Sequence, residues 1–183
     1  MASVLVPLAQ GCEELEAVTI IDLLVRAGAR VTSAGLQPGP IKASRGVVLL
    51  PDTDLDSALQ QDYDMVVLPG GMPGAQHLQD DPRIIRLLQS MAATDKYTAA
   101  ICAAPKVLAA AGLLDGKRAT SYPGFLDHDP APGMHYESAA VVQDGRLITS
   151  RGPGTAMEFA LCLIENLFGK AKRDEVEAGL QRG

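Results

Sequence analysis

The sequence predicts an α/β protein, a three-layer α/β sandwich in which a mostly parallel sheet lies between two layers of helices. Short apolar runs such as SVLVPLA and DMVVLPGG are typical of strands that are buried on both faces. Longer segments that end at a glycine or begin near a proline separate these runs and are typical of helices. Because the two kinds of segment alternate along the chain, right-handed crossovers between parallel strands are expected.

In the first half of the chain, strand patterns lie at residues 3–9, 29–36 and 64–71, with a hairpin or pair of edge strands at 41–52. Helix patterns lie at 13–28 and 81–94. Gly28 closes the first helix, and Asp81 is a candidate N-cap of the second, with Pro82 in its first turn. The hairpin is expected to turn near Ser44–Gly46.

In the second half, strand patterns lie at 97–101 and 118–122, with a β-hairpin at 139–150. Helix patterns lie at 103–114 and 153–169. Gly112 stops the first of these helices and Gly169 ends the last. The Asp144-Gly145 pair suits the type I′ turn of a two-residue hairpin loop.

Length and composition favour one domain, residues 1–183, without a repeat or linker. The chain carries 16 basic and 22 acidic residues, a net charge of −6, which gives it no electrostatic attraction to nucleic acid or to an anionic membrane. The N-terminus lacks the basic region of a signal peptide, and no apolar run reaches the roughly 18 residues that span a membrane. We therefore expect a cytoplasmic protein.

Cysteine and histidine spacing predicts neither a disulfide framework nor a metal site. The three cysteines are far apart in the sequence: Cys12, Cys102 and Cys162. The three histidines form no known metal-binding spacing: His77, His128 and His135. We expect no cofactor. Cys162 lies in the middle of an apolar helical segment and is expected in the core, whereas Cys12 follows the first strand and is a weaker candidate for the site.

Cys102 is the candidate reactive residue, because it lies between a predicted strand and a predicted helix at the edge of the sheet where α/β proteins build their sites. The placement resembles a nucleophile elbow, and the small Ala103 and Ala104 permit a tight turn. A helix start carries partial positive charge, which favours a thiolate, and Pro105 fits the first turn. The alternative is a cysteine buried simply as a small apolar side chain.

The glycine-rich segment LPGGMPGA follows a central strand and ends at the same edge. Gly70 and Gly71 allow the backbone to approach a ligand closely. The N–H groups of Gly71 and Ala103 are candidates for an oxyanion hole. A phosphate cradle is the weaker alternative, because neither a GxGxxG motif nor a Walker lysine is present.

Glu16 is the most informative acid, because it shares a helical arc with the apolar residues Ile20, Leu23 and Ala27. A carboxyl group directed into that arc is expected to have a raised pKa and to reach Cys102. The alternative is a first-turn acid that complements the helix dipole, a role that Glu13 and Glu14 fit better. The rest of the helix is apolar nearly all round, which suggests a second buried face such as a dimer interface.

Four segments in order, EELEAV, LPGGMPGAQ, AAICAAP and TSRGPGTAMEFAL, resemble the ThiJ/PfpI superfamily, and within it the branch of the Parkinson-disease-associated protein deglycase. The resemblance covers nearly the whole chain and implies a flavodoxin-like fold and a homodimer. It also implies a reactive, oxidation-prone Cys102, hydrogen-bonded to Glu16, with Gly71 and Ala103 at the pocket. Arg26 and Arg45 match arginines near the site and the dimer interface.

The resemblance implies cofactor-free conversion of methylglyoxal to lactate (glyoxalase III), deglycation of early glyoxal adducts on proteins and nucleotides, and redox-linked chaperone function in stress protection. One position departs from the pattern, because Tyr122 stands where many relatives carry a histidine beside the cysteine. Tyrosine is a poor base at neutral pH, and His128 and His135 lie in a predicted surface loop. A hydrolytic Cys-His pair is therefore not supported.

Two functions stay open from the sequence. The first is an enzyme in which Cys102 attacks the aldehyde of a small dicarbonyl and Glu16 moves the proton. The second is a non-enzymatic redox sensor or chaperone in which Cys102 is oxidised. A binding domain for a phosphorylated ligand is disfavoured, because the strand-end loops lack a Ser/Thr-rich phosphate loop.

Overall fold

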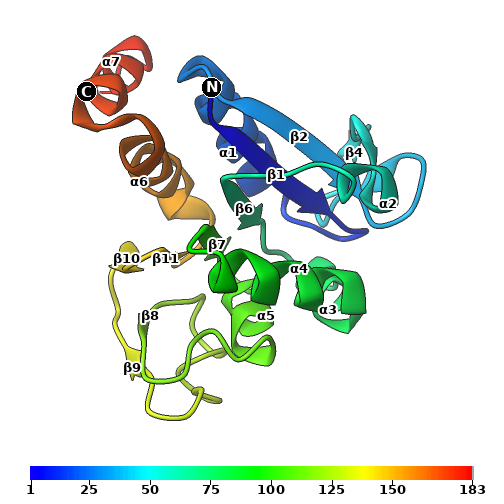
Figure 1. The fold of residues 1–183 in the computed structure, drawn as a ribbon, viewed down its shortest axis with the longest axis vertical. Helices are drawn as coiled ribbons and strands as arrows, with labels where there is room; N and C mark the ends of the chain where they lie inside the picture. The colour runs from blue at the N-terminus through cyan, green and yellow to red at the C-terminus, as the bar shows by residue number, and fades with distance from the viewer. Residues whose placement is uncertain (183) are drawn as a thin grey trace.

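A seven-stranded sheet organises the chain, of which the computed structural model describes residues 1–182 (Figure 1). Its strands are β1 (Ser3–Leu8), β2 (Arg30–Gly35), β5 (Thr53–Asp54), β6 (Met65–Leu68), β7 (Tyr97–Ile101), β10 (Val141–Asp144) and β11 (Leu147–Ser150). They lie in the order β10-β11-β7-β6-β1-β2-β5. All neighbours are parallel except the β10–β11 hairpin. The β1, β6 and β7 strands therefore end at one edge of the sheet.

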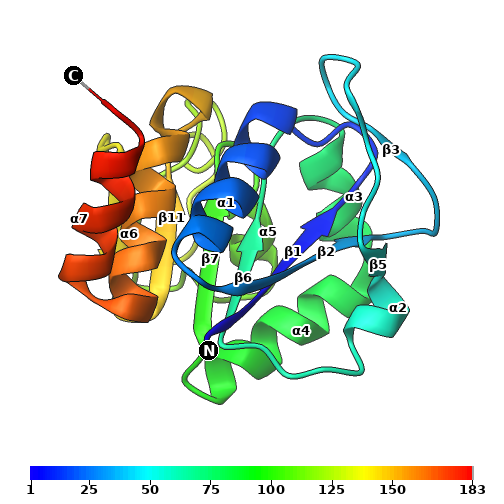
Figure 2. The same cartoon turned by 90° about the horizontal axis from the view of Figure 1, so that it is seen from above.

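Helices cover both faces of this sheet (Figures 1 and 2). One layer consists of α1 (Glu14–Arg26), α6 (Ala156–Phe168) and α7 (Lys170–Gly179), and α6 packs between the other two. The other layer consists of α3 (Gly74–Asp80), α4 (Pro82–Ala93) and α5 (Pro105–Ala110). The short α2 (Leu55–Ala58) follows β5, and a 3-10 turn, η1 (Pro153–Thr155), precedes α6. The predicted three-layer α/β sandwich with a mostly parallel sheet is confirmed.

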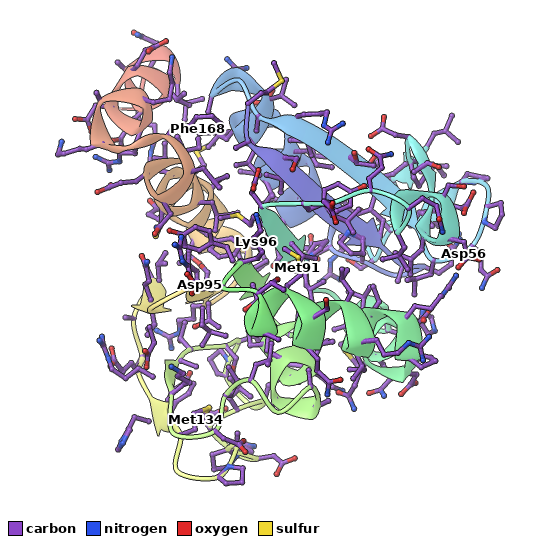
Figure 3. All side chains as sticks on the ribbon, viewed as in Figure 1. Asp56, Met91, Asp95, Lys96, Met134 and Phe168 are labelled. Carbon is purple, nitrogen blue, oxygen red and sulfur yellow. The ribbon has the colours of Figure 1, made fainter. Side chains whose placement is uncertain are left out.

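Local sequence signals account for much of this order. All residues of β1 and β6 are buried, which is why their sequences are apolar apart from Ser3 at the start of β1. Asp81 caps α4 by accepting a hydrogen bond from the Arg83 N–H at 2.9 Å, with Pro82 in the first turn. Side chains fill the space between the helices and the sheet in Figure 3, and the largest fully buried one is Phe159 of α6.

Several elements differ from the sequence prediction, which also lacked the short β5 and α2. The expected strand at 118–122 is shorter, and its β8 (Arg118–Ala119) pairs with β9 (His135–Tyr136) outside the main sheet. The residue that follows β8 is instead hydrogen-bonded to a side chain of β11, because the Thr120 N–H donates to Thr149 Oγ1. Sequence reasoning missed α3, which buries only one strongly apolar side chain, Leu78. It also missed α7, which Gly169 separates from α6.

All three cysteines are free thiols. Cys12 and Cys102 are buried, but Cys162 is only partly buried, which differs from the expected core position. Its Sγ lies 3.8 Å from Oε1 of Gln143, because this side of α6 faces β10 rather than the core. Within residues 1–182, no group of three or more His, Cys, Asp or Glu side chains is arranged to hold a metal ion. None of the helices in these residues has both the length and the apolar character to cross a membrane.

Candidate active site

Cys102 occupies a strained turn directly after β7. Its φ of +64° lies in the left-handed region that non-glycine residues rarely adopt. Two hydrogen bonds hold this conformation, because the Cys102 N–H donates to the carbonyl oxygen of Ser150 at 2.9 Å and its carbonyl accepts from the Tyr122 N–H at 2.8 Å. The residue is 8% exposed, so the turn presents it at the sheet edge while leaving little of it in solvent. The neighbours Ala103 and Ala104 are buried.

Gly70 brings the cysteine and the candidate acid together. Its N–H donates to Oε2 of Glu16 at 2.7 Å. A methyl group built on Gly70 would lie 2.6 Å from Cβ of Cys102 and 2.9 Å from Oε2 of Glu16, so the two side chains flank the same face of this peptide. Gly71 has a φ of +84°, and a Cβ there would lie 2.4 Å from the backbone nitrogen of Glu13. Both positions therefore require glycine.

Glu16 is fully buried, as its position on the apolar arc of α1 predicted. Burial raises the pKa of its carboxyl group to about 7, although the Gly70 N–H and the Cys102 thiol oppose this shift. Within the described residues, Oε1 has no partner that meets hydrogen-bond geometry. A buried carboxylate with an unpaired oxygen is costly, and protonation of the carboxyl group lowers that cost because it removes the buried charge.

Burial also raises the pKa of the Cys102 thiol, to about 12, and the negative charge of Glu16 adds to the shift. Hydrogen bonds from the N–H groups of Gly71 and Ala103 to the sulfur lower the pKa of the thiol and so partly offset this rise. The helix start alone does not produce the thiolate expected from the sequence, because desolvation and the nearby carboxylate outweigh a six-residue helix. Near neutral pH the Cys102 thiol therefore keeps its proton, while the carboxyl group of Glu16 is close to the midpoint of its titration.

The other site residues predicted from the sequence are Tyr122, Arg45 and Arg26, and the structure places them in different surroundings. The ring of Tyr122 is 48% exposed and packs against Gly152. Arg45 is exposed in the turn between β3 (Ile41–Lys42) and β4 (Val48–Leu49), and its backbone N–H donates to Glu14. Arg26 is not brought to Cys102 within this chain. It pairs with Asp22 at the far end of α1, a 13-residue helix about 20 Å long.

His128 and His135 are both exposed in the segment after Tyr122, in keeping with the surface position predicted for them. Cys12 is fully buried, and burial raises the pKa of its thiol to about 11, with Glu14 adding to the effect. Sequence reasoning missed Ser150, whose carbonyl fixes the Cys102 turn. The sequence holds no signal for this role of Ser150, because every residue type carries the backbone carbonyl that accepts the bond.

With this geometry established, comparison with known proteins identifies the family. The model of the DJ-1/PfpI family matches residues 2–166. The chain belongs to this family. Among its relatives, protein dj-1beta of Drosophila melanogaster is 47% identical over 179 residues, covering 97% of this chain and 96% of the relative. A Caenorhabditis elegans relative named glutathione-independent glyoxalase DJR-1.2 is 37% identical over 167 residues, covering 91% and 89%.

Solved structures of the DJ-1/PfpI family share the fold. The crystal structure of Drosophila melanogaster DJ-1beta has a TM-score of 0.94 and 46% identity, and the match covers 100% of this chain and 98% of that one. A Toxoplasma gondii DJ-1 structure described as oxidized has a TM-score of 0.94 and 41% identity, with 98% of both chains covered. The resemblance seen in the sequence motifs is thereby confirmed at the level of the family.

The raised pKa of Glu16 predicts a pH dependence of stability. The unfolded chain ionises this carboxyl near its ordinary value of 4.5, whereas the folded chain holds the proton to about 7. Between these values the folded state binds more protons, so the free energy of unfolding falls as pH rises, by on the order of 3 kcal/mol in total, and stays constant above.

Urea denaturation of the wild type and Glu16→Gln at several pH values checks this expectation. The wild-type curve should decline relative to the variant between about pH 4.5 and 7, the window set by the two pKa values. Parallel pH dependences of the two proteins would show that Glu16 titrates normally in the fold.

Proposed function

We propose that this protein is a cofactor-free enzyme in which Cys102 attacks the aldehyde of a small dicarbonyl and Glu16 is the sole proton carrier. The observation that supports the proposal is a buried carboxyl group and a buried thiol on the same face of Gly70, with the N–H groups of Gly71 and Ala103 at the sulfur. A carboxyl group with a pKa of about 7 suits such a reaction, because the same group must take and return a proton at successive steps.

The first half of the proposed reaction forms a carbon–sulfur bond. Glu16 as carboxylate takes the proton of the Cys102 thiol, and the thiolate adds to the aldehyde carbon of methylglyoxal. The aldehyde oxygen becomes an alkoxide, which the N–H groups of Gly71 and Ala103 stabilise. Protonated Glu16 then returns the proton to this oxygen. The product is a neutral hemithioacetal, and Glu16 is again a carboxylate.

The second half moves a hydrogen between adjacent carbons. Glu16 removes the proton from the carbon that carries sulfur, giving an enediolate, and delivers it to the neighbouring carbon. The hydroxyl proton of the first carbon passes to the oxygen of the second, so that a carbonyl forms next to the sulfur. The result is a lactoyl thioester of Cys102, which water hydrolyses to lactate and the free thiol. Methylglyoxal and one water are consumed for each lactate, and the electrons are redistributed within the substrate, so no external oxidant is required.

The relative named as a glutathione-independent glyoxalase supports this class of reaction. The exposed ring of Tyr122 offers no neutral-pH base that would favour a Cys-His hydrolase instead. With an early glyoxal adduct, the bond between the aldehyde carbon and the amine, thiol or guanidine breaks first, that group leaves with a proton in its unmodified form, and Cys102 takes its place on the carbon. The steps above then give a hydroxy acid. Deglycation of proteins and nucleotides in stress protection is therefore part of the proposal.

Lactate formation from methylglyoxal tests the enzyme directly. We expect Cys102→Ala to abolish it, and Glu16→Gln to lower kcat by on the order of a hundredfold or more, because the amide cannot carry the proton. Cys162→Ser should retain the wild-type rate, since that thiol lies on α6 beside β10. Equal lactate production by wild type and Cys102→Ala would overturn the proposal.

Oxidation of Cys102 is the second candidate function, that of a redox sensor or chaperone. The observation that favours it is the pair of N–H groups at the sulfur, which would also stabilise the negative charge of a sulfinate. Two equivalents of hydrogen peroxide each transfer one oxygen atom to the sulfur and leave as water, taking the thiol through the sulfenate to the sulfinate.

Intact-mass measurement after mild peroxide treatment checks this function. We expect a species heavier by about 32 Da, two oxygen atoms, that is absent in Cys102→Ser. The Cys162→Ser variant serves as the control and should form it normally. Resistance of the wild type to peroxide would argue against sensing without touching the enzymatic proposal.

We infer that the protein is a homodimer that buries an apolar face formed by α1 and the β3–β4 hairpin. The face consists of six side chains, each about half exposed or more: Leu15, Val18, Val25, Val47, Val48 and Leu50. The α1 members lie on one side of the helix, because three- and seven-residue spacings return to the same face. Such a large apolar surface is typical of a protein–protein contact, and a second copy presents the same face.

Sedimentation velocity tests the dimer. We expect the wild type to sediment with twice the mass of one chain and Val18→Asp, which places a charge within the apolar face, to sediment as a monomer. Arg86→Ala, an exposed position on α4 in the opposite layer, is the control and should leave the dimer intact. A monomeric wild type, or a dimeric Val18→Asp, would contradict the inference.

A further inference from the structure

Glu14 makes a set of contacts that the proposed reaction does not use. Its carboxylate is buried and accepts the Arg45 N–H at 3.0 and 3.1 Å, and the Val47 N–H at 3.4 Å. The Ser44 hydroxyl lies 3.2 Å from the same group and 2.8 Å from the carboxylate of Glu13. Burial alone would raise the pKa of Glu14, but hydrogen bonds from its own helix turn, Arg45, Val47 and Ser44 lower it below its ordinary value.

The turn that Glu14 holds belongs to a short hairpin. The β3–β4 ladder consists of two residue pairs, Ile41 with Leu49 and Lys42 with Val48. Within the turn, the Ala43 N–H donates to the Val47 carbonyl and the Gly46 N–H to the Ala43 carbonyl. Because a two-residue ladder is weak by itself, the bonds that the Glu14 carboxylate accepts from Arg45 and Val47 add to what holds the tip of this hairpin.

The same turn is bonded to the segment that precedes α1. The Ser44 N–H donates to the carbonyl of Cys12, and the Gly11 N–H donates to the carbonyl of Lys42, both at 2.8 Å. This segment in turn contacts the glycine pair, because the Glu13 N–H donates to the carbonyl of Gly70 at 2.9 Å.

The contact with Gly71 is as close as the backbone permits. A Cβ on Gly71 would lie 2.4 Å from the Glu13 nitrogen and 2.8 Å from the Cys12 carbonyl carbon. A shift of the segment before α1 therefore displaces the Gly70–Gly71 peptides, and with them the Gly71 N–H that acts on the sulfur of Cys102.

We propose that Glu14 is a positioning residue for Cys102: its carboxylate clamps the Ala43–Val47 turn, and the turn holds the Gly11–Glu13 segment against Gly70 and Gly71. Glu14 touches neither the sulfur nor the substrate and acts through these backbone contacts. The inference rests on the proposed function in so far as Cys102 is the reacting group, and it is independent of which electrophile Cys102 attacks. A contiguous set of packed groups of this kind carries the effect from the hairpin to the thiol.

Glu14→Gln tests the clamp, because an amide keeps one acceptor oxygen but places an N–H₂ group against the donors of the turn. Two measurements on the full chain are compared with wild type. Amide hydrogen exchange of Arg45 and Val47 reports whether the turn is held. The rate of Cys102 alkylation by iodoacetamide at pH 8, followed by mass spectrometry of the Cys102 peptide, reports the thiolate fraction.

We expect both amides to lose protection and alkylation to slow by about tenfold, which corresponds to one unit of pKa at a pH well below that of the thiol. Faster alkylation would mean that the hairpin only covers the cysteine. Unchanged alkylation with exposed amides would mean that the clamp has no influence on the site. Either outcome overturns the proposal, as does full protection of the two amides in the variant.

Asp54→Asn is the matched control. Asp54 likewise caps a turn with its carboxylate, accepting from the Ser57 N–H at 2.9 Å and its hydroxyl at 3.0 Å. It lies on β5, which β6, β1 and β2 separate from β7, so its loss should leave Cys102 alkylation at the wild-type rate. A similar slowing in this control would show that a general loss of stability, rather than positioning, explains the effect.

Ser44→Ala provides a milder variant should Glu14→Gln fail to fold. It removes the hydroxyl donor to Glu13 and Glu14 but keeps the Arg45 and Val47 bonds, so alkylation should slow by about twofold to threefold. An unchanged or increased rate would count against the clamp. Because iodoacetamide replaces the dicarbonyl, failure here is distinguishable from failure of the proposed lactate-forming activity, which would leave these alkylation differences intact.

Discussion

The contact of Glu16 with Gly70 is the constraint on which the site depends. A carboxyl group with no solvent exposure accepts a 2.7 Å hydrogen bond from the Gly70 N–H, and Cys102 lies on the same face of that peptide. Gly70 can make this bond only because it has no side chain, since a Cβ would overlap both partners. The acid and the thiol are thus held together by a backbone group, and the pKa of each depends on the position of the other.

The sheet supplies the rigidity that this arrangement needs. β1, β6 and β7 are adjacent and parallel, so the first turn of α1, the Gly70–Gly71 pair and the Cys102 turn meet at one edge. The β11 strand, parallel to β7, adds the Ser150 carbonyl that accepts the Cys102 N–H. Three segments far apart in sequence therefore converge without a flexible loop, and the unfavourable φ of Cys102 is balanced by hydrogen bonds to the framework.

The arrangement of Glu16 and Cys102 lowers the stability of the folded state. A buried carboxyl group and a buried thiol cost free energy, and a strained cysteine adds to that cost. A fold with a continuous core on both faces of the sheet tolerates such costs, because the surrounding layers are closely packed. In return, the site holds a carboxyl group that titrates near neutral pH beside a thiol in a dry environment, the property on which the proposed dicarbonyl reaction depends.

Much of this molecule was predictable from local patterns. Alternating strands and helices indicated the layered sheet, and the position of Cys102 between a strand and a helix indicated the sheet edge. Glu16 stood out because a carboxylate on an apolar helical arc has no local explanation. Elements without periodicity, such as α3, gave no such signal, because long-range packing rather than local pattern forms them.

What residue types encode locally, namely the layered sheet, the cysteine between a strand and a helix and the acid on an apolar helical arc, was determined by the sequence itself. Only the tertiary structure decided the high pKa of the Cys102 thiol, since desolvation depends on everything packed around the sulfur. It alone separated Arg26 from the site and joined Glu14 to the hairpin. The physical reason is that these properties arise from distances between segments that are remote in the chain, which no local spacing records.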